Sequence, residues 1–542
     1  MSAAAQPNVV FVVANDWGRY ASAYAQREGP GGLNALITTP HFDRVAAEGV
    51  LFLNAFAPAP GCNPSRNSLL SGRYFWQTGL GAIEQGTIWD EAIPTFPLEL
   101  EKSGYLIGYT GEVTVKTKNA PMGGDRTGFH SAGQDFDNFS SWVTKHAPEK
   151  GVEAAKEALL TEVRENFRNF LAGRRSPGQP FCYWWGPTTT HRSFEPGSGK
   201  ALWGIDPDAL QGRMPAASPD VHALREDLAD YLGEVMALDR GLGMLLGELE
   251  ARGELAKTLV VVTGDHGAPG LPRAKANLYD SGLQVPLAMC WPGRIPPGRV
   301  IDDFVNTMDL APTVCEAAGI GVPVGMTART LMPLLTSGRS GQVEAERDAV
   351  ITGRERHVSI SREGCLPYPQ RALRTRAFSY IVNYEPDRWP MGDPHGLDDP
   401  AVEVADSEGL AKDTMLVFPD FDASPTKAWM IRHRRLPEVR PLYELTFGKR
   451  PREELYDLDQ DPHCMRNVAA EKAYAEVRGR LEERLNSVLA AQQDPRILER
   501  PCRYELAPYA SIDAKYTTEK GRTMMEELRQ RRASWQRARA KL

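Results

Sequence analysis

Between residues 8 and 320, short apolar runs alternate with long helical stretches, and this alternation limits the possible folds more than any other feature. The helical stretches, residues 154–171 and 224–249, carry apolar side chains at steps of three and four residues, the period of an amphipathic helix. The short runs are apolar on both faces, as strands buried between two helix layers are. These runs are residues 9–13, 181–185, 258–263 and 285–291. The pattern predicts an α/β domain with a large, mostly parallel sheet between helix layers.

From about residue 370 the pattern changes to that of a smaller α+β domain. Residues 377–384 alternate like an exposed strand, residues 454–458 form another short strand, and residues 469–492 have the pattern of a helix. A chain of 542 residues exceeds what one core usually organises. We therefore expect a large domain over residues 1–370, a smaller one over 371–500 and a basic helical tail over 501–542. The tail is either a solvated or subunit-contacting helix or an anion-binding arm.

Charge and hydropathy exclude several classes of protein. The formal net charge of −7 argues against a nucleic-acid binder, which would carry a clearly basic domain. No apolar run approaches the roughly 20 residues that a membrane-spanning helix needs. Seven widely spaced cysteines suit a reducing compartment, and the first seven residues lack the pattern of a secretory signal. We expect a soluble, cytoplasmic protein that binds neither nucleic acid nor membranes.

Polar side chains follow two of the predicted buried strands. Asn15 and Asp16 come after the first strand, and Asp265 and His266 come after the strand at 258–263. Carboxyl ends of parallel strands are where α/β sheets place ligands, and these oxygens and the imidazole are donors for a divalent cation. An Asx turn that merely closes the strand is the simpler interpretation of Asn15-Asp16 alone. Taken together, the two strand ends predict a metal site.

A third chemical signal is the stretch Cys-Asn-Pro-Ser-Arg at residues 62–66. It lies at the start of a predicted helix over residues 65–71. A helix N-terminus beside the Arg66 guanidinium would bind an anion and lower the pKa of the Cys62 thiol. A structural cysteine before a helix is the alternative.

These residues resemble the signature of the sulfatase family, Cys-x-Pro-Ser-Arg followed by a Leu-Thr-Gly-Arg-like stretch, here Leu-Ser-Gly-Arg at 70–73. The resemblance covers about residues 7–490. Residues around Lys275 and Arg371 are most similar to N-sulfoglucosamine sulfohydrolases and their bacterial relatives. The other stretches that resemble family landmarks are 7–16, 38–43, 263–267, 277–279, 285–286 and 455–462.

The resemblance implies an alkaline-phosphatase-like α/β sandwich, with a large mixed, mostly parallel sheet between helix layers and a smaller C-terminal α+β domain with an antiparallel sheet. Residues 1–370 would then be the catalytic domain. It also implies a hydrolase that acts on small anionic substrates, and we expect a homodimer or a higher homo-oligomer.

In that family a formylglycine-generating enzyme converts the cysteine to formylglycine, so the resemblance implies the same for Cys62. One hydroxyl of the hydrated aldehyde would attack sulfur, and the other would then lose a proton and expel sulfate. Arg66 would orient the diol, Lys275 would contact the sulfate, and His191 would protonate the leaving group. His191 as a hydrogen-bonded loop histidine is the alternative. The implied metal ligands are Asn15, Asp16, Asp265, His266 and residue 62.

The sequence departs from the family pattern at three positions. Glu112 stands where the family commonly has a sulfate-binding lysine, and Thr114 stands where it has a histidine. Either Glu112 points away, or it pairs with a cation such as Lys116 or Lys118, or the substrate is itself cationic. Asn15 replaces a more usual aspartate, which weakens calcium binding and moves the expectation from calcium toward manganese, with calcium still favoured.

We therefore expect a sulfatase that hydrolyses aryl sulfates, sugar sulfates or sulfamates. A phosphonate monoester or phosphodiester hydrolase with the same formylglycine is the alternative, because some of these enzymes have threonine at the position of Thr114. A non-catalytic binding protein is a third interpretation. Arg354 and His357, in the stretch 354–357, would line the pocket entrance, unless that stretch is ordinary surface charge. Tryptophans that could stack a substrate are Trp76, Trp89, Trp184, Trp185 and Trp203, with core packing favoured for Trp184 and Trp185.

Overall fold

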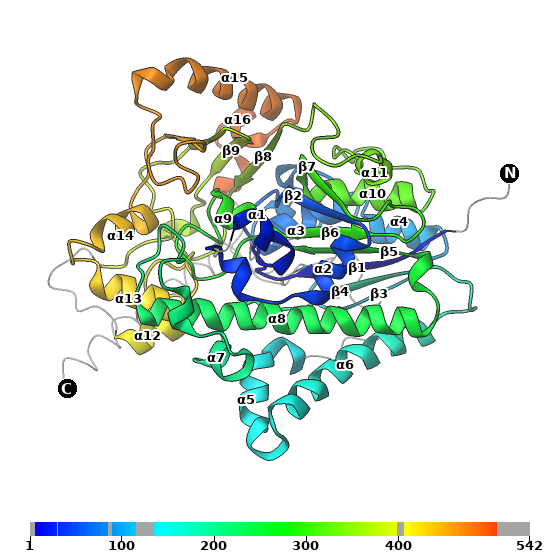
Figure 1. Ribbon diagram of the computed structural model, residues 1–542. Coiled ribbons are helices and arrows are strands. Elements are labelled where there is room, and N and C mark those ends of the chain that lie inside the picture. Colours follow the sequence, from blue (N-terminus) through cyan, green and yellow to red (C-terminus); the bar gives the residue numbers. More distant parts are fainter. Residues whose placement is uncertain are drawn as a thin grey trace.

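The computed structural model describes residues 6–29, 31–84, 89–114, 135–397, 406–506 and 530. Within them the chain forms a seven-stranded sheet between helices and a separate four-stranded sheet (Figure 1). The predicted basic tail lies outside the described residues beyond 506, apart from residue 530, and so do Lys116 and Lys118.

The large sheet has the strand order β3-β4-β1-β5-β6-β2-β7. All neighbours are parallel except β6, which runs antiparallel to both β5 and β2. The four strands predicted from apolar runs are confirmed as β1, β4, β5 and β6. The bounds are β1 Asn8–Ala14, β2 Val50–Phe56, β3 Leu106–Gly111, β4 Phe181–Gly186, β5 Thr258–Gly264, β6 Leu287–Cys290 and β7 Arg299–Asn306.

Helices cover both faces of this sheet, and the side chains of β1 alternate between the two layers. Val10 and Val12 pack in one core with the helices α2 (Pro40–Ala47), α5 (Phe139–Lys150), α6 (Val152–Ala172) and α8 (His222–Ala251). Phe11 and Val13 pack in the other core with α3 (Cys62–Ser71), α4 (Phe96–Lys102) and α10 (Leu310–Ala317). Burial on both faces explains why the strand sequences are continuously apolar. The two long helices predicted from periodicity are α6 and α8.

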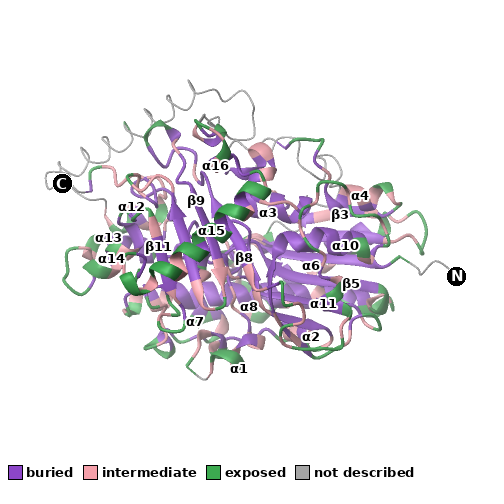
Figure 2. Ribbon diagram, turned by 90° about the horizontal axis from the view of Figure 1, so that it is seen from above, coloured by how far each residue is buried: buried purple, intermediate pink, exposed green. Residues whose placement is uncertain are grey.

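The second sheet is antiparallel, with the order β11-β10-β9-β8. Its strands are β8 Ala349–Arg354, β9 Gln370–Thr375, β10 Phe378–Asn383 and β11 Glu453–Asp457. One face packs against α15 (Ala475–Ala491), whose outer side is exposed (Figure 2). Because β8 precedes residue 370, this sheet starts before the second domain was expected to start.

The expectation that residues 377–384 form an exposed strand is wrong. They form β10, which pairs on both edges and is buried at every position except Phe378. Tyr380 packs toward α15, whereas Ile381 joins the core of the large sheet. Its polar residues bond within the protein: Asn383, for example, accepts a hydrogen bond from Gln370 at 2.7 Å.

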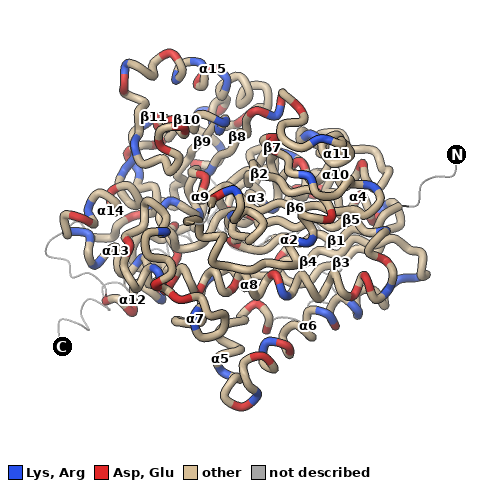
Figure 3. Tube along the Cα trace, in the orientation of Figure 1, with Lys and Arg blue, Asp and Glu red and all other residues tan. Residues whose placement is uncertain are grey.

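Short helices complete the described chain. Acidic and basic side chains are mixed along outer helices such as α6 and α15 (Figure 3). Among the described residues, no helix is long and apolar enough to cross a membrane. The short helices are α1 Ala25–Glu28, α7 Ser198–Trp203, α9 Asp280–Leu283, α11 Met332–Thr336, α12 Ser407–Lys412, α13 Pro425–His433, α14 Arg440–Phe447 and α16 Pro495–Leu498.

Candidate active site

The carboxyl ends of β1 and β5 lie side by side, as predicted, and bring two pairs of polar residues together. The amide of Asp265 donates to the carbonyl of Ala14 at 3.1 Å, which continues the pairing of the strands by one residue. Asp16 has a left-handed backbone with φ of 56°, and its amide donates to Oδ1 of Asp265 at 2.8 Å. Both side chains are fully buried.

Cys62 is the first residue of α3 and lies against these strand ends. Its Sγ atom is 3.3 Å from Oδ1 of Asn15, 3.3 Å from Nε2 of His266 and 3.8 Å from Oδ1 of Asp16. Burial raises the pKa of the Cys62 thiol well above its ordinary value; the charge of Lys275 opposes this rise, and those of Asp265 and Asp16 add to it. The expected lowering of this pKa is therefore wrong. An unmodified Cys62 would stay a thiol at neutral pH.

Four side chains form a buried cluster that can hold a metal ion, which we call the metal corner: Asp16, Cys62, Asp265 and His266. One ligand atom of each lies within 4.8 Å of those of the others. Nδ1 of His266 lies 3.0 Å from the carbonyl of Gly267, and as a donor to it would leave Nε2 free to bind a cation. Asn15 adds an amide oxygen beside Cys62. Oxygens and one imidazole nitrogen fit a divalent cation.

Arg66 fixes one of these ligands and also explains where Glu112 points. The guanidinium is fully buried, and its Nε atom donates to Oδ2 of Asp265 at 2.8 Å. The same Nε lies 3.3 Å from Oε1 of Glu112, and another nitrogen of Arg66 donates to the Glu112 carbonyl at 2.8 Å. Among the described residues Glu112 thus pairs with a cation, Arg66, in agreement with one of the three interpretations, and Lys116 and Lys118 lie outside the described residues. Thr114 is partly exposed and ends the described segment.

Lys275 and His191 approach the metal corner at Asp16. Nζ of Lys275 lies 2.8 Å from Oδ2 of Asp16 and 3.5 Å from Oδ2 of Asp422. Nε2 of His191 lies 3.9 Å from the same oxygen of Asp16, while its Nδ1 lies 2.7 Å from the carbonyl of Arg192. His191 is 39 % exposed, so its free ring nitrogen lies where a substrate could reach it.

Three acidic residues that the sequence motifs did not indicate support or border this site. Glu84 accepts a hydrogen bond from the amide of Asn63 beside Cys62, and burial raises the pKa of Glu84 to about 8. Glu234 accepts hydrogen bonds from Thr189 and from the amide of Ser140, which holds the loop before His191. Asp422 lies beside Lys275. Glu84 and Glu234 belong to no chemical motif, and Asp422 lies in a long polar stretch with nothing to single it out.

Arg354 and His357 lie in the interior, so the alternative of ordinary surface charge for the stretch 354–357 is wrong. Arg354 is buried, donates to the carbonyl of Ala276 at 2.6 Å and pairs with Asp420 at 2.5 Å. His357 packs against Gly61, where a Cβ atom would lie 3.0 Å from its Nδ1. Burial lowers the pKa of His357 to about 3, so it is neutral. Trp184 is a core residue, stacked on Phe11 with ring centroids 5.2 Å apart.

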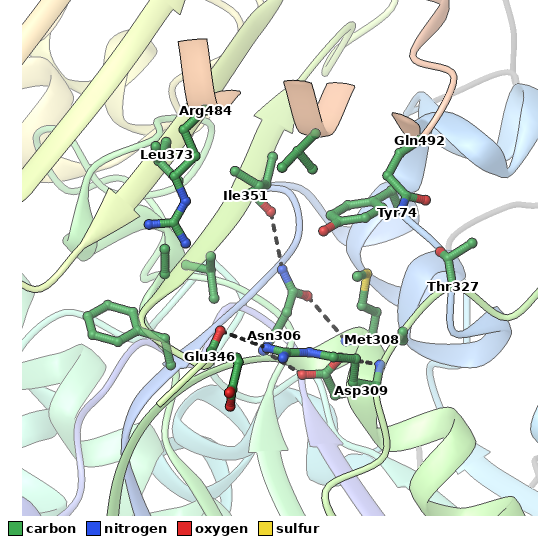
Figure 4. A pocket seen from close by; sticks show the side chains of 16 residues that line it. Tyr74, Asn306, Met308, Asp309, Thr327, Glu346, Ile351, Leu373, Arg484 and Gln492 are labelled. Atoms are coloured by element: carbon green, nitrogen blue, oxygen red, sulfur yellow. Dashed lines mark hydrogen bonds between the residues drawn. The ribbon is translucent and has the colours of Figure 1, made fainter. Parts of the chain in front are cut away.

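A separate pocket of about 260 Å³ lies between the two sheets (Figure 4). Its lining includes residues of β7, β8, β9 and α15, and Asn306 of β7 donates to the carbonyl of Ile351 of β8 at 3.4 Å. None of the residues that line it belongs to the metal corner or to the side chains around that corner.

The large sheet between helix layers and the separate antiparallel sheet form the alkaline-phosphatase-like fold that was expected, with the metal corner at the strand ends of the large sheet. Residues 7–320 match the sulfatase family model. The chain belongs to the sulfatase family, whose enzymes are sulfuric ester hydrolases.

Among its relatives, the N-sulphoglucosamine sulphohydrolase of Homo sapiens is 27% identical over 523 residues, covering 90% of this chain and 91% of the relative. An ulvan-active sulfatase of Formosa agariphila is 27% identical over 401 residues, or 70% of this chain and 73% of the relative. The resemblance to sulfatases that the sequence motifs indicated is confirmed.

Solved structures share the fold. A protein in complex with its substrate D-glucosamine-2-N,6-O-disulfate has a TM-score of 0.58 at 19% identity, covering 90% of this chain and 98% of that one. The phosphonate monoester hydrolase of Agrobacterium radiobacter has a TM-score of 0.57 at 19% identity, covering 90% of this chain and 96% of that one.

Proposed function

We propose that this protein is a formylglycine-dependent sulfatase that hydrolyses sulfate esters or sulfamates with the help of one divalent cation. The observation that supports this most is the position of Cys62. The residue that the family signature modifies lies at the start of α3, with its Sγ 3.3 Å from His266 and from Asn15. A nucleophile built on residue 62 would therefore adjoin both the cation and Lys275.

Formylglycine at position 62, once hydrated, supplies a geminal diol as the nucleophile, and the cation lowers the pKa of that diol. The ligands would be Asn15, Asp16, Asp265, His266 and residue 62. Calcium is the proposed ion and manganese the alternative. A formylglycine-generating enzyme is the implied partner. A cytoplasmic location and a homo-oligomeric state stay predictions.

The side chains around residue 62 would bind the sulfate, donate a proton to the leaving group and position a metal ligand. Lys275 is held next to Asp16, where its ammonium can bind a sulfate oxygen and offset negative charge that develops in the transition state. Nε2 of His191 lies on the exposed side and can donate a proton to the departing oxygen or nitrogen. Arg66 keeps the Asp265 carboxylate in place through its hydrogen bond.

The second candidate is a phosphonate monoester or phosphodiester hydrolase, favoured by Thr114 and by the likeness to the Agrobacterium fold. The two functions are separated by kcat/KM on 4-nitrophenyl sulfate and on bis(4-nitrophenyl) phosphate, with Cys62→Ala as the control for both. A higher value on the sulfate supports the proposal. A higher value on the phosphodiester would replace it with the second candidate, and equal turnover by Cys62→Ala would refute both.

A further inference from the structure

The side chains around the metal corner include more carboxylates than cations, even without Glu84, whose pKa of about 8 leaves it mostly protonated at pH 7. The carboxylates are Asp16, Asp265, Glu112 and Asp422, and the described cations that pair with them are Arg66 and Lys275. A divalent cation would offset the two remaining negative charges. The loaded site would then be close to neutral, so its overall charge would not attract a substrate that is only an anion.

Asp422 is the carboxylate of this group that neither belongs to the metal corner nor pairs with Arg66. It precedes α13, and its Oδ2 atom is 3.5 Å from Nζ of Lys275. That oxygen is buried and, among the described residues, receives no hydrogen bond. The side chain as a whole keeps 19 % of its surface exposed, so a bound molecule can contact Asp422 outside that buried oxygen. A cationic group there would meet the negative charge of the carboxylate.

The charge of Asp422 persists at neutral pH. Burial alone would raise the pKa of Asp422, but the surrounding positive charge, above all that of Lys275, holds this pKa well below its ordinary value. Lys275, which contacts Asp422, and His191, the proposed proton donor to the leaving group, approach the same oxygen of Asp16, at 2.8 and 3.9 Å. Asp422 and the proposed proton donor are thus linked through Lys275 and this one oxygen.

Glu112 is a second carboxylate of the site with a buried oxygen that accepts no hydrogen bond among the described residues. Its Oε1 atom lies 3.3 Å from Nε of Arg66 but, within the described chain, accepts no hydrogen bond. Burial raises the pKa of Glu112, and the charge of Arg66 opposes this rise. Two carboxylates, each with an oxygen that accepts no hydrogen bond among the described residues, thus lie beside the cations of the site.

Resting on the proposed function, we infer that Asp422 is a specificity-determining residue that binds an ammonium or similar cationic group on the leaving group. The preferred substrate is then a zwitterion, with a sulfate at the metal corner and a cation at Asp422. A charge-assisted hydrogen bond is about twice as strong as a neutral one, so an uncharged leaving group would satisfy Asp422 less well.

The test compares two small ligands that differ in this charge: 2-aminoethyl sulfate and propyl sulfate. Calorimetric titration of the calcium-loaded protein at pH 7 gives a dissociation constant for each. Wild-type protein, Asp422→Asn and Glu408→Gln are compared. Glu408 lies on α12 with 75 % of its side chain exposed, so Glu408→Gln makes the same change in charge away from the site.

We expect wild-type protein and Glu408→Gln to bind 2-aminoethyl sulfate about tenfold more tightly than propyl sulfate or better. In Asp422→Asn this preference should fall to about twofold or less. A wild-type preference near one, a preference that Asp422→Asn retains, or no binding of either ligand would overturn the inference. The comparison of the two ligands on wild-type protein tests the inference even if Asp422→Asn does not fold. The titration also needs no turnover, so its outcome is independent of the 4-nitrophenyl sulfate assay that tests the proposed function.

Discussion

Nζ of Lys275 lies 2.8 Å from Oδ2 of Asp16, so the buried cation of the site is fixed on a carboxylate of the metal corner. Burial alone would lower the pKa of Lys275, but Asp16 and Asp422 outweigh it and raise this pKa well above its ordinary value. Lys275 is therefore charged throughout the neutral pH range and is available to a sulfate oxygen.

Replacement of Lys275 by alanine should lower kcat/KM on 4-nitrophenyl sulfate by roughly two to four orders of magnitude, because positive charge is lost where negative charge develops. Lys257→Ala, at an exposed position before β5, is the matched control. Steady-state kinetics on 4-nitrophenyl sulfate give kcat/KM for both variants and for the wild-type enzyme. A Lys275→Ala enzyme with the wild-type rate would show that Lys275 does not act on the transferred group.

For His191→Ala, the expected loss depends on the leaving group. Nitrophenolate departs without a proton, whereas an alkoxide needs one, so the rate should fall roughly 10²–10⁴-fold on an alkyl sulfate and much less on 4-nitrophenyl sulfate. Rates on the two substrates at one pH give this ratio. An equal fall on both would argue that His191 binds substrate or supports the loop and does not donate the proton.

Stability should fall as the pH rises through the titration of Glu234. Burial raises the pKa of Glu234 from 4.5 to about 7, so the folded protein keeps a proton that the unfolded chain releases near pH 4.5. Between these values the unfolded chain binds fewer protons, and the free energy of unfolding decreases with pH. At one pK unit per 1.4 kcal/mol, Glu234 accounts for up to about 3 kcal/mol of this decrease.

Glu234→Gln, which cannot ionise, should therefore show a shallower decline between pH 4.5 and 7 in urea unfolding. Asp230 and Asp239 also have pKa values raised to about 7 by burial, so part of the decline remains. Glu157→Gln, on the exposed side of α6, should keep the wild-type slope. Identical slopes for all three proteins would mean that Glu234 does not hold a proton in the folded state.

Removal of metal should abolish turnover and lower the midpoint of thermal unfolding, because Asp16 and Asp265 would lose the cation that offsets their charge. Calcium and manganese, added back separately, show which ion restores each property. In Asp265→Asn, calorimetric titration should show metal affinity lowered roughly tenfold or more. Full activity in excess chelator would contradict a metal role for this corner.

Much of the site could be predicted because the positions of buried strands and the chemistry of motifs are local properties of the sequence. The apolar runs before Asn15 and Asp265 indicated buried parallel strands, and such strands end at one edge of the sheet. The structure places β1 beside β5, so those residues meet. Cys62 joins them because α3 starts at the residue that the family signature marks.

Other features depend on contacts that no local pattern contains. The pairing of Glu112 with Arg66 joins residues that are 46 positions apart, and burial of β10 depends on partners on both edges and on α15. The pKa of Cys62 was expected to fall near a helix N-terminus, but burial beside two carboxylates dominates. Asp422 lies within a polar stretch, and its proximity to Lys275 becomes visible only in the fold.

The central claim is that residue 62 is a matured nucleophile. The most direct measurement is the mass of the tryptic peptide that ends at Arg66, from protein produced with and without a formylglycine-generating enzyme. We predict a peptide roughly 18 Da lighter than the thiol form in the first sample, since sulfur leaves as H2S and oxygen takes its place, with turnover in proportion to the lighter form. A peptide that keeps the thiol despite a competent maturation enzyme, or turnover without the lighter peptide, would contradict the claim.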